Sequence, residues 1–313
     1  MVQKTNIKLI LALISIAFFW GTTFLGIRIG VETIPPILVT GLRNILAGGL
    51  ILVYLLISGK FEKVSWPRLR RNMVIAFMMI VLANGLTTYA EIYISSGLAA
   101  LISTLSPLCV LLLNLVLGHE KLSFKIVFGV LLGISGMYLI YQNNLADLFN
   151  PEYRVGIMAI LFAVLMWASG TIFTKKSAAH PGNMFMNLCI QMFFAGIFML
   201  ILQLLVQPDF QVSEWSLRST LAVIYLALFG SVVGYVAYTY ALSHLPSTKV
   251  SVITYVNVVV ALVLGWLILN EELTGRMIFA AVLIISGVIV ANYRKKPVEV
   301  LIPTHPPVPQ KEG

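Results

Sequence analysis

Ten apolar stretches, each about long enough to cross a bilayer, constrain this chain more than any other feature of its sequence. A bilayer core takes ~20 residues of helix, and only short connections separate the stretches. Hydrophobic residues fill 59% of the 313 positions and charged residues 11%, against roughly 25% charge in a soluble domain. We therefore expect an all-α integral membrane protein. The expected spans are 9–30, 35–57, 72–95, 97–117, 124–142, 155–175, 183–206, 219–242, 247–269 and 276–293.

The two ends of the chain differ from the apolar region between them. The run that follows Lys8 is too long for the core of a signal peptide, so we interpret it as the first span. Beyond Tyr293 the sequence is rich in proline and poor in apolar residues. We expect residues 294–313 to form a disordered cytoplasmic tail.

Lysine and arginine predict the orientation of the spans. With ten spans and both termini in the cytoplasm, 16 basic residues fall on the cytoplasmic side, whereas Arg28, Arg154, Arg218 and Arg276 fall outside and Arg43 lies in the membrane. This asymmetry follows the positive-inside rule. The net charge of +9 therefore reflects membrane topology, and we expect a plasma (inner) membrane location and no nucleic-acid partner.

The chain also resembles itself. Residues 117–123 reappear as 268–274, and Tyr89-Ala90 reappears as Tyr240-Ala241 at the same offset, while Trp20 matches Trp167 at a slightly smaller one. Because each repeat holds five spans, an odd number, the second copy must enter the membrane inverted. We expect a first five-helix repeat at 1–142, a linker loop at 143–154 and a second repeat at 155–293.

Several motifs together resemble the EamA-type two-repeat permeases of the drug/metabolite transporter superfamily. They are residues 19–24, Arg43-Asn44, residues 90–100, and Pro107 followed by Glu120. The resemblance covers residues 9–293 and implies a transporter. In one departure, Val258 stands where the first half has Pro107, so we expect any kink of the fourth span to be absent or weaker in the ninth.

The resemblance implies that the first, third and fourth spans of each half line a central substrate cavity. Trp20 and Trp167 lie mid-span, where an indole N–H needs a partner. The residues expected at the cavity are Trp20, Thr23, Asn84, Tyr89, Ser103, Trp167, Tyr235, Tyr238, Thr254 and Asn257. The alternative for each is packing between helices.

Four charged residues invite a functional interpretation. Arg43 lies ~12 Å inside the second span, where an arginine must face the bundle interior or a wet cavity. Glu91 is its natural partner, as a gating pair or as a structural ion pair, and Glu91 is also a candidate site for a coupling proton. Glu120 and Glu271 are repeat-equivalent turn carboxylates, and we expect each to interact with the N-terminus of the helix that follows it.

These patterns favour a secondary, non-ATP transporter that moves a small organic metabolite, an amino acid or a drug-like compound, as an exporter by alternating access. No phosphate-binding loop is present in the sequence, and the four histidines show no metal-ligand spacing, so we expect no cofactor and no metal. The alternatives are a membrane-embedded enzyme and a passive pore or scaffold.

Overall fold

The structure, a computed structural model, describes residues 7–118, 123–141, 150–177, 182–251 and 253–292, and helices are the regular elements of these ranges. Seven helices are long and apolar enough to span a membrane: Ile7–Gly30, Pro36–Ile57, Trp66–Ala90, Ser96–Val116, Pro151–Lys176, Met184–Val206 and Leu217–His244. Three shorter apolar helices are Phe124–Gly136, Thr254–Leu269 and Gly275–Gly287. The expectation of an all-α, multi-span membrane protein is confirmed.

Some of these spans are single helices, and others consist of two or three consecutive elements. The elements of the first half are α1 (Ile7–Gly30), α2 (Pro36–Ile57), α3 (Trp66–Ala76), the π-helix η1 (Phe77–Asn84), α4 (Gly85–Ala90), α5 (Ser96–Ser103), α6 (Ser106–Val116) and α7 (Phe124–Tyr141). In the second half they are α9 (Pro151–Ser177), α10 (Met184–Val206), the 3₁₀ turn η2 (Val212–Glu214), α11 (Leu217–Tyr225), the π-helix η3 (Leu226–Val233), α12 (Gly234–His244), α13 (Ser247–Ser251), α14 (Thr254–Leu269) and α15 (Gly275–Asn292).

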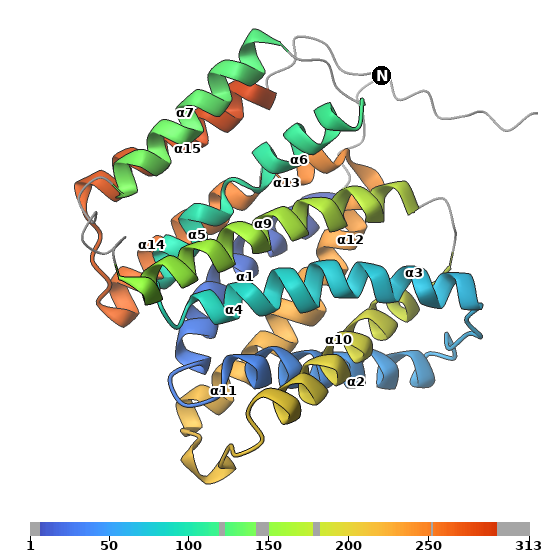
Figure 1. Cartoon of the computed structure of the whole chain (residues 1–313). Coiled ribbons are helices and arrows are strands. Elements are labelled where there is room, and N and C mark those ends of the chain that lie inside the picture. The colour runs from blue at the N-terminus through green and yellow to red at the C-terminus, as the bar shows by residue number, and fades with distance from the viewer. Residues whose placement is uncertain (1–6, 119–122, 142–149, 178–181, 252, 293–313) are drawn as a thin grey trace, which may run out of the picture.

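Helices from the two halves pair at both edges of the molecule. Helices α7 and α15 lie side by side at one edge, and α2 and α10 lie side by side at the other, with α1, α9, α4 and α12 between them (Figure 1). Glycines allow the first pair to approach closely, since a Cβ on Gly287 would lie 2.6 Å from the Gly129 carbonyl oxygen. Each edge is therefore built from one helix of each half.

The fourth and ninth spans are both interrupted, which corrects our expectation about the proline. Helix α5 ends at Ser103 and α6 begins at Ser106, while α13 ends at Ser251 and α14 begins at Thr254. Short i to i+3 bonds tighten both turns: Thr104 N–H donates to Leu101 O at 3.1 Å, and Val256 N–H donates to Ile253 O at 3.0 Å. Proline is not required for such an interruption, because the ninth span has Val258 where the fourth has Pro107 and is interrupted as well.

The third and eighth spans share a feature that the sequence did not predict. Each changes from α-helix to π-helix near its middle, at η1 and η3, and then returns to α-helix. The two π segments occupy corresponding positions of the two halves. A π segment releases backbone carbonyls from the regular ladder and is frequent at functional sites. Segment η1 supplies Ala83 and Asn84 to the lining of the central cavity described below, and η3 accepts a hydrogen bond from one of its aromatic residues.

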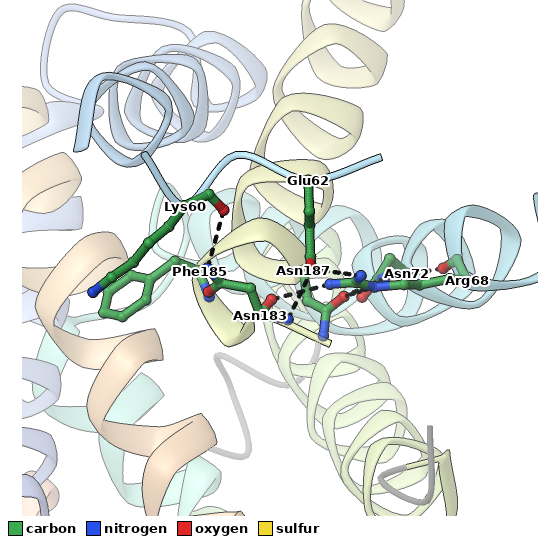
Figure 2. Close-up of polar contacts among 7 residues, drawn as sticks. All are labelled: Lys60, Glu62, Arg68, Asn72, Asn183, Phe185 and Asn187. Atoms are coloured by element: carbon green, nitrogen blue, oxygen red, sulfur yellow. Dashed lines mark hydrogen bonds and ion pairs between the residues drawn. The ribbon is translucent and has the colours of Figure 1, made fainter. Parts of the chain in front are cut away.

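A polar network ties the halves together at one end of the molecule (Figure 2). Arg68 forms an ion pair with Glu62 at 2.6 Å and donates to Asn187 Oδ1 at 2.7 Å. The backbone N–H of Asn183 donates to the same Glu62 carboxylate at 2.8 Å. The Asn183 N–H, and then Arg68, lower the pKa of Glu62. The network joins the start of α3 to the start of α10.

Some sequence predictions fall outside the described residues. These are Glu120, the tail 294–313 and most of the linker 143–154.

Candidate functional site: a central cavity between the halves

A cavity of about 100 Å³ lies at the middle of the bundle. Eight of the ten residues expected there line it: Trp20, Thr23, Asn84, Ser103, Trp167, Tyr235, Thr254 and Asn257. The lining also includes Phe24, Ile27, Arg43, Ala83, Thr87, Ser106, Ala163 and Val164. Among these lining residues Arg43 carries the only charge. The wall is thus aromatic and hydrogen-bonding, with a single cation.

Four aromatic rings form one cluster at the cavity. The rings of Trp20 and Trp167 meet edge to face, with centroids 5.2 Å apart and planes at 83°. Tyr238 contacts both indoles, with centroids 5.0 Å from Trp20 and 5.3 Å from Trp167. Tyr235 contacts both as well, at 5.7 and 6.0 Å. Edge-to-face pairs are favourable beyond their burial, so these contacts stabilise the cluster as one wall of the cavity.

Residues that correspond in the two repeats meet each other here. Trp20 and Trp167 correspond and are in contact. Asn84 and Tyr235 correspond at the repeat offset, and the Asn84 Nδ2 donates to the Tyr235 hydroxyl at 3.0 Å. Two equivalent residues can touch only near the axis that relates the halves. The cavity therefore lies where the two halves face each other.

The π segments supply acceptors to this cluster. The Trp20 Nε1 donates to the Gly230 carbonyl of η3 at 3.0 Å, and the Tyr235 hydroxyl donates to the Met79 carbonyl of η1 at 3.4 Å. Gly230 and Met79 correspond in the two repeats. The two π segments thus bind the aromatic wall in related ways.

Two glycines of the eighth span make room for cavity side chains. A Cβ on Gly234 would lie 2.1 Å from Trp20 Nε1, and a Cβ on Gly230 would lie 3.0 Å from an Arg43 guanidinium nitrogen. Gly234 thus accommodates an indole, and Gly230 accommodates the Thr23 methyl group, 2.6 Å from such a Cβ, as well as the guanidinium. Any larger residue at Gly234 must displace Trp20.

Tyr238 and Tyr89 do not line the central cavity, although Tyr238 belongs to the aromatic cluster beside it. Tyr238 lines a second cavity of about 240 Å³, together with Tyr235, Arg71, Asn72 and Lys175. Tyr235 borders both cavities, so the aromatic cluster separates them. The Tyr89 hydroxyl is 3.1 Å from the Tyr93 hydroxyl, and Tyr89 is not among the residues that line either cavity.

Arg43 and Glu91 are both buried, at 3% and 0% exposure, but the expected direct pair is not formed. The Arg43 Nε donates to the Ser231 hydroxyl of η3 at 3.1 Å, because its side chain extends across Gly230. Both carboxylate oxygens of Glu91 are buried without a hydrogen-bond partner. No ion pair joins these two residues within the described part of the chain, and their roles in gating stay predictions.

Glu271 interacts with a helix N-terminus, but not with that of the helix that follows it. Its carboxylate accepts from the backbone N–H groups of Ser96 and Gly97, at 2.8 and 3.0 Å, at the start of α5. Asn270 adopts a left-handed conformation (φ 53°), and Glu271 N–H donates back to Gly265 O at 3.1 Å. This turn directs the carboxylate toward the first half and away from α15, which corrects our expectation.

Helical spacing accounts for several of the lining residues that sequence reasoning missed. Phe24 and Ile27 continue the α1 face of Trp20 and Thr23, and Ser106 follows Ser103 by three positions. The same rule places Thr87 beside Asn84. Metal-ligand clusters are absent from the described residues.

The sequence matches known proteins across almost its whole length. The EamA-like transporter family matches twice, at residues 7–142 and 154–293. An Escherichia coli strain K12 protein, the uncharacterized inner membrane transporter YedA, is 31% identical over 88% of this chain and 90% of its own. A Bacillus subtilis protein, the uncharacterized transporter YoaV, is 24% identical over 92% of this chain and 97% of its own. A solved crystal structure shares the fold, with TM-score 0.68 at 20% identity, over 92% of this chain and 98% of that one.

Two helical halves around a polar, aromatic cavity define a membrane transporter. This chain belongs to the EamA-like transporter family of the drug/metabolite transporter superfamily, with two EamA domains. It is a multi-pass membrane protein and a transporter rather than an enzyme, as its relatives are. The family resemblance seen in the sequence is confirmed.

Proposed function

We propose that this chain is a secondary transporter that moves a small organic metabolite by alternating access around the central cavity. The observation that carries the proposal is that equivalent residues of the two repeats, Trp20 with Trp167 and Asn84 with Tyr235, meet at that cavity. A site near the relating axis can face either side when the two halves exchange conformations. We propose the same inverted arrangement that the sequence predicts, with repeats at 1–142 and 155–293, a linker at 143–154 and both termini cytoplasmic.

The lining supports a substrate class. Aromatic faces bind apolar groups, Asn84, Ser103 and Asn257 offer hydrogen bonds, and Arg43 can hold one carboxylate. A phosphate ester would need more than one cation. We therefore propose an amino acid or a drug-like amphipathic compound as substrate, export as the direction, and the inner membrane as the location.

The cavity is smaller than its substrate requires. Ligand sites commonly measure ≈300–1,000 Å³, whereas this cavity measures about 100 Å³. Tyr235 and Tyr238 separate it from the second cavity, which opens beside Arg71 and Lys175. We infer that the conformation is contracted around the site and that the aromatic cluster must move when substrate enters.

A flux assay tests this proposal. Purified protein in proteoliposomes is given labelled amino acids and common amphipathic metabolites, with an excess of each unlabelled compound as competitor. The proposal expects saturable uptake that one class of unlabelled compound suppresses. Flux that rises linearly with concentration and resists competition would instead assign a passive pore.

A further inference from the structure

Glu271 joins the two halves just after α14, at the end of the molecule opposite the start of α3, where the Arg68 network lies (Figure 1). It follows α14 of the second half, and it binds the Ser96 and Gly97 N–H groups at the start of α5 in the first half. These N–H groups have no partner within their own helix. A carboxylate there gains two charge-assisted bonds and a favourable interaction with the helix dipole.

Two glycines fit this carboxylate closely. A Cβ on Gly265 would lie 2.5 Å from Glu271 Oε2, and a Cβ on Gly97 would lie 3.3 Å from the same oxygen. We call this contact, made of Glu271, Ser96, Gly97 and Gly265, the Glu271 clamp. It holds α5 and α14 together, and both helices continue toward the central cavity. Opening this end of the molecule requires the clamp to separate.

Water can reach the clamp from one side. A cavity of about 690 Å³ lies against it, lined by Glu271, Tyr93, Ser95 and Arg276 among others. Glu271 is half-buried at its edge. The side chain of Glu91, which is fully buried, lies close enough to Glu271 for the two carboxylates to interact electrostatically.

Glu91 has a different environment from Glu271. It lies in the turn between the spans Trp66–Ala90 and Ser96–Val116, fully buried, and neither carboxylate oxygen has a hydrogen-bond partner. An unpaired buried charge is very costly, so such a group takes up a proton. Desolvation, and then the charge of Glu271, raise the pKa of Glu91 well above its ordinary value.

The charged groups around Glu91 come from several elements. Arg28 of α1 donates to the Glu91 backbone carbonyl rather than to its carboxylate, and it favours the charged form of Glu91 together with Arg43 of α2. Glu271 opposes them. At the start of α9, Glu152 and Arg154 are exposed.

We propose that Glu91 is a proton-binding site, and that its proton holds the Glu271 clamp closed. Loss of the proton places a second negative charge near Glu271, on the Glu91 side chain, which is fully buried. The clamp then separates, and water from the adjoining cavity solvates Glu91 and receives the proton. The role of this switch in carrying substrate rests on the proposed transport function, whereas the switch itself does not.

The pH dependence follows from this difference between the closed and open states. In the open, hydrated state the pKa of Glu91 returns toward the ordinary value of a glutamate, and in the closed state its pKa is higher. The free energy that the proton contributes to closure is therefore fully present at pH values below the ordinary pKa, and it decreases as the pH rises toward the raised pKa of the closed state. Within that window the ratio of open to closed protein changes by at most ~10-fold per pH unit for one site.

A labelling experiment tests the proposal. Ser96→Cys is introduced after Cys109→Ala and Cys189→Ala, since Ser96 is fully buried and uses its backbone N–H in the clamp. A membrane-impermeant maleimide then reports opening. We expect the labelling rate, divided at each pH by that of the Glu91→Gln variant, to rise with pH. The Glu91→Gln variant should itself be labelled slowly, and the Glu271→Gln variant should be labelled fast even at acidic pH.

A control variant and a second measurement keep the test decisive. Glu32→Gln alters an exposed acidic residue paired with Arg218 at 3.6 Å and should leave the pH dependence unchanged. In the unmodified protein, hydrogen exchange at Ser96 and Gly97, corrected for the intrinsic rate, should accelerate with pH. Equal pH dependence in wild type and Glu91→Gln, or constant protection of those amides, would overturn the proposal. Absent flux with a normal labelling response would contradict the transport function alone.

Discussion

Replacement of Gly234 by alanine tests the aromatic wall most severely. The new Cβ would lie 2.1 Å from Trp20 Nε1 and 2.7 Å from its Cδ1, so the indole must move and lose its 3.0 Å bond to Gly230 O. Overpacking costs ~1–3 kcal/mol, and an unsatisfied buried donor costs ~1–3 kcal/mol. Alanine in a helix stabilises the folded protein by ~0.5–1 kcal/mol relative to glycine, which offsets part of this loss. The net expected loss of stability is roughly 1–5 kcal/mol.

Gly49 provides a matched control. It is also a helical glycine, and a Cβ there would meet nothing within 4 Å, so Gly49→Ala should be neutral or stabilising by ~0.5–1 kcal/mol. Thermal unfolding of both variants in detergent, followed by tryptophan fluorescence and near-UV circular dichroism, separates the two effects. If Gly234→Ala unfolds at the wild-type temperature with an unchanged aromatic spectrum, the account of the Trp20 site is refuted.

Two further predictions concern contacts between the halves. Tyr235→Phe and Asn84→Ala should each destabilise the protein, and a double-mutant cycle should give a coupling of ~1 kcal/mol for their 3.0 Å bond; additive effects would contradict that bond. Because the Asn183 N–H and Arg68 lower the pKa of Glu62, its carboxylate stabilises the protein at neutral pH and ceases to do so as pH falls through that lowered pKa. The difference in melting temperature between wild type and Glu62→Gln should therefore shrink on acidification, and a difference that stays constant would exclude the role of the charge.

Much of the architecture could be predicted because bilayer thickness sets the length of each apolar stretch and because the two halves resemble each other in sequence. The spans and the repeat follow from these two features. The cavity residues were predicted largely from the resemblance and from mid-span polar and aromatic side chains such as Trp20 and Asn84. Their neighbours on the same helical faces could have been added by counting three or four positions.

The remaining features depend on side-chain direction and on local backbone geometry. Nothing in the residues of η1 or η3 distinguishes a π-helix from an α-helix in apolar sequence. Glu271 turns back to α5 because Asn270 adopts a left-handed conformation, and Arg43 bonds Ser231 because Gly230 leaves space for it. The directions of the Glu271 and Arg43 side chains thus depend on a single φ angle and on a single glycine. The sequence pattern alone does not predict either direction.

Solute counterflow tests the central claim most directly. Proteoliposomes loaded with an excess of unlabelled substrate, chosen as a compound that raises the melting temperature of the protein, are diluted into a trace of the labelled form. A carrier that alternates around the cavity predicts a transient accumulation of label above equilibrium, which Trp167→Ala should strongly reduce because the cavity loses one indole and the Trp20 ring loses one of its edge-to-face partners. Simple equilibration without an overshoot, or an overshoot unchanged in Trp167→Ala, would contradict transport through this cavity.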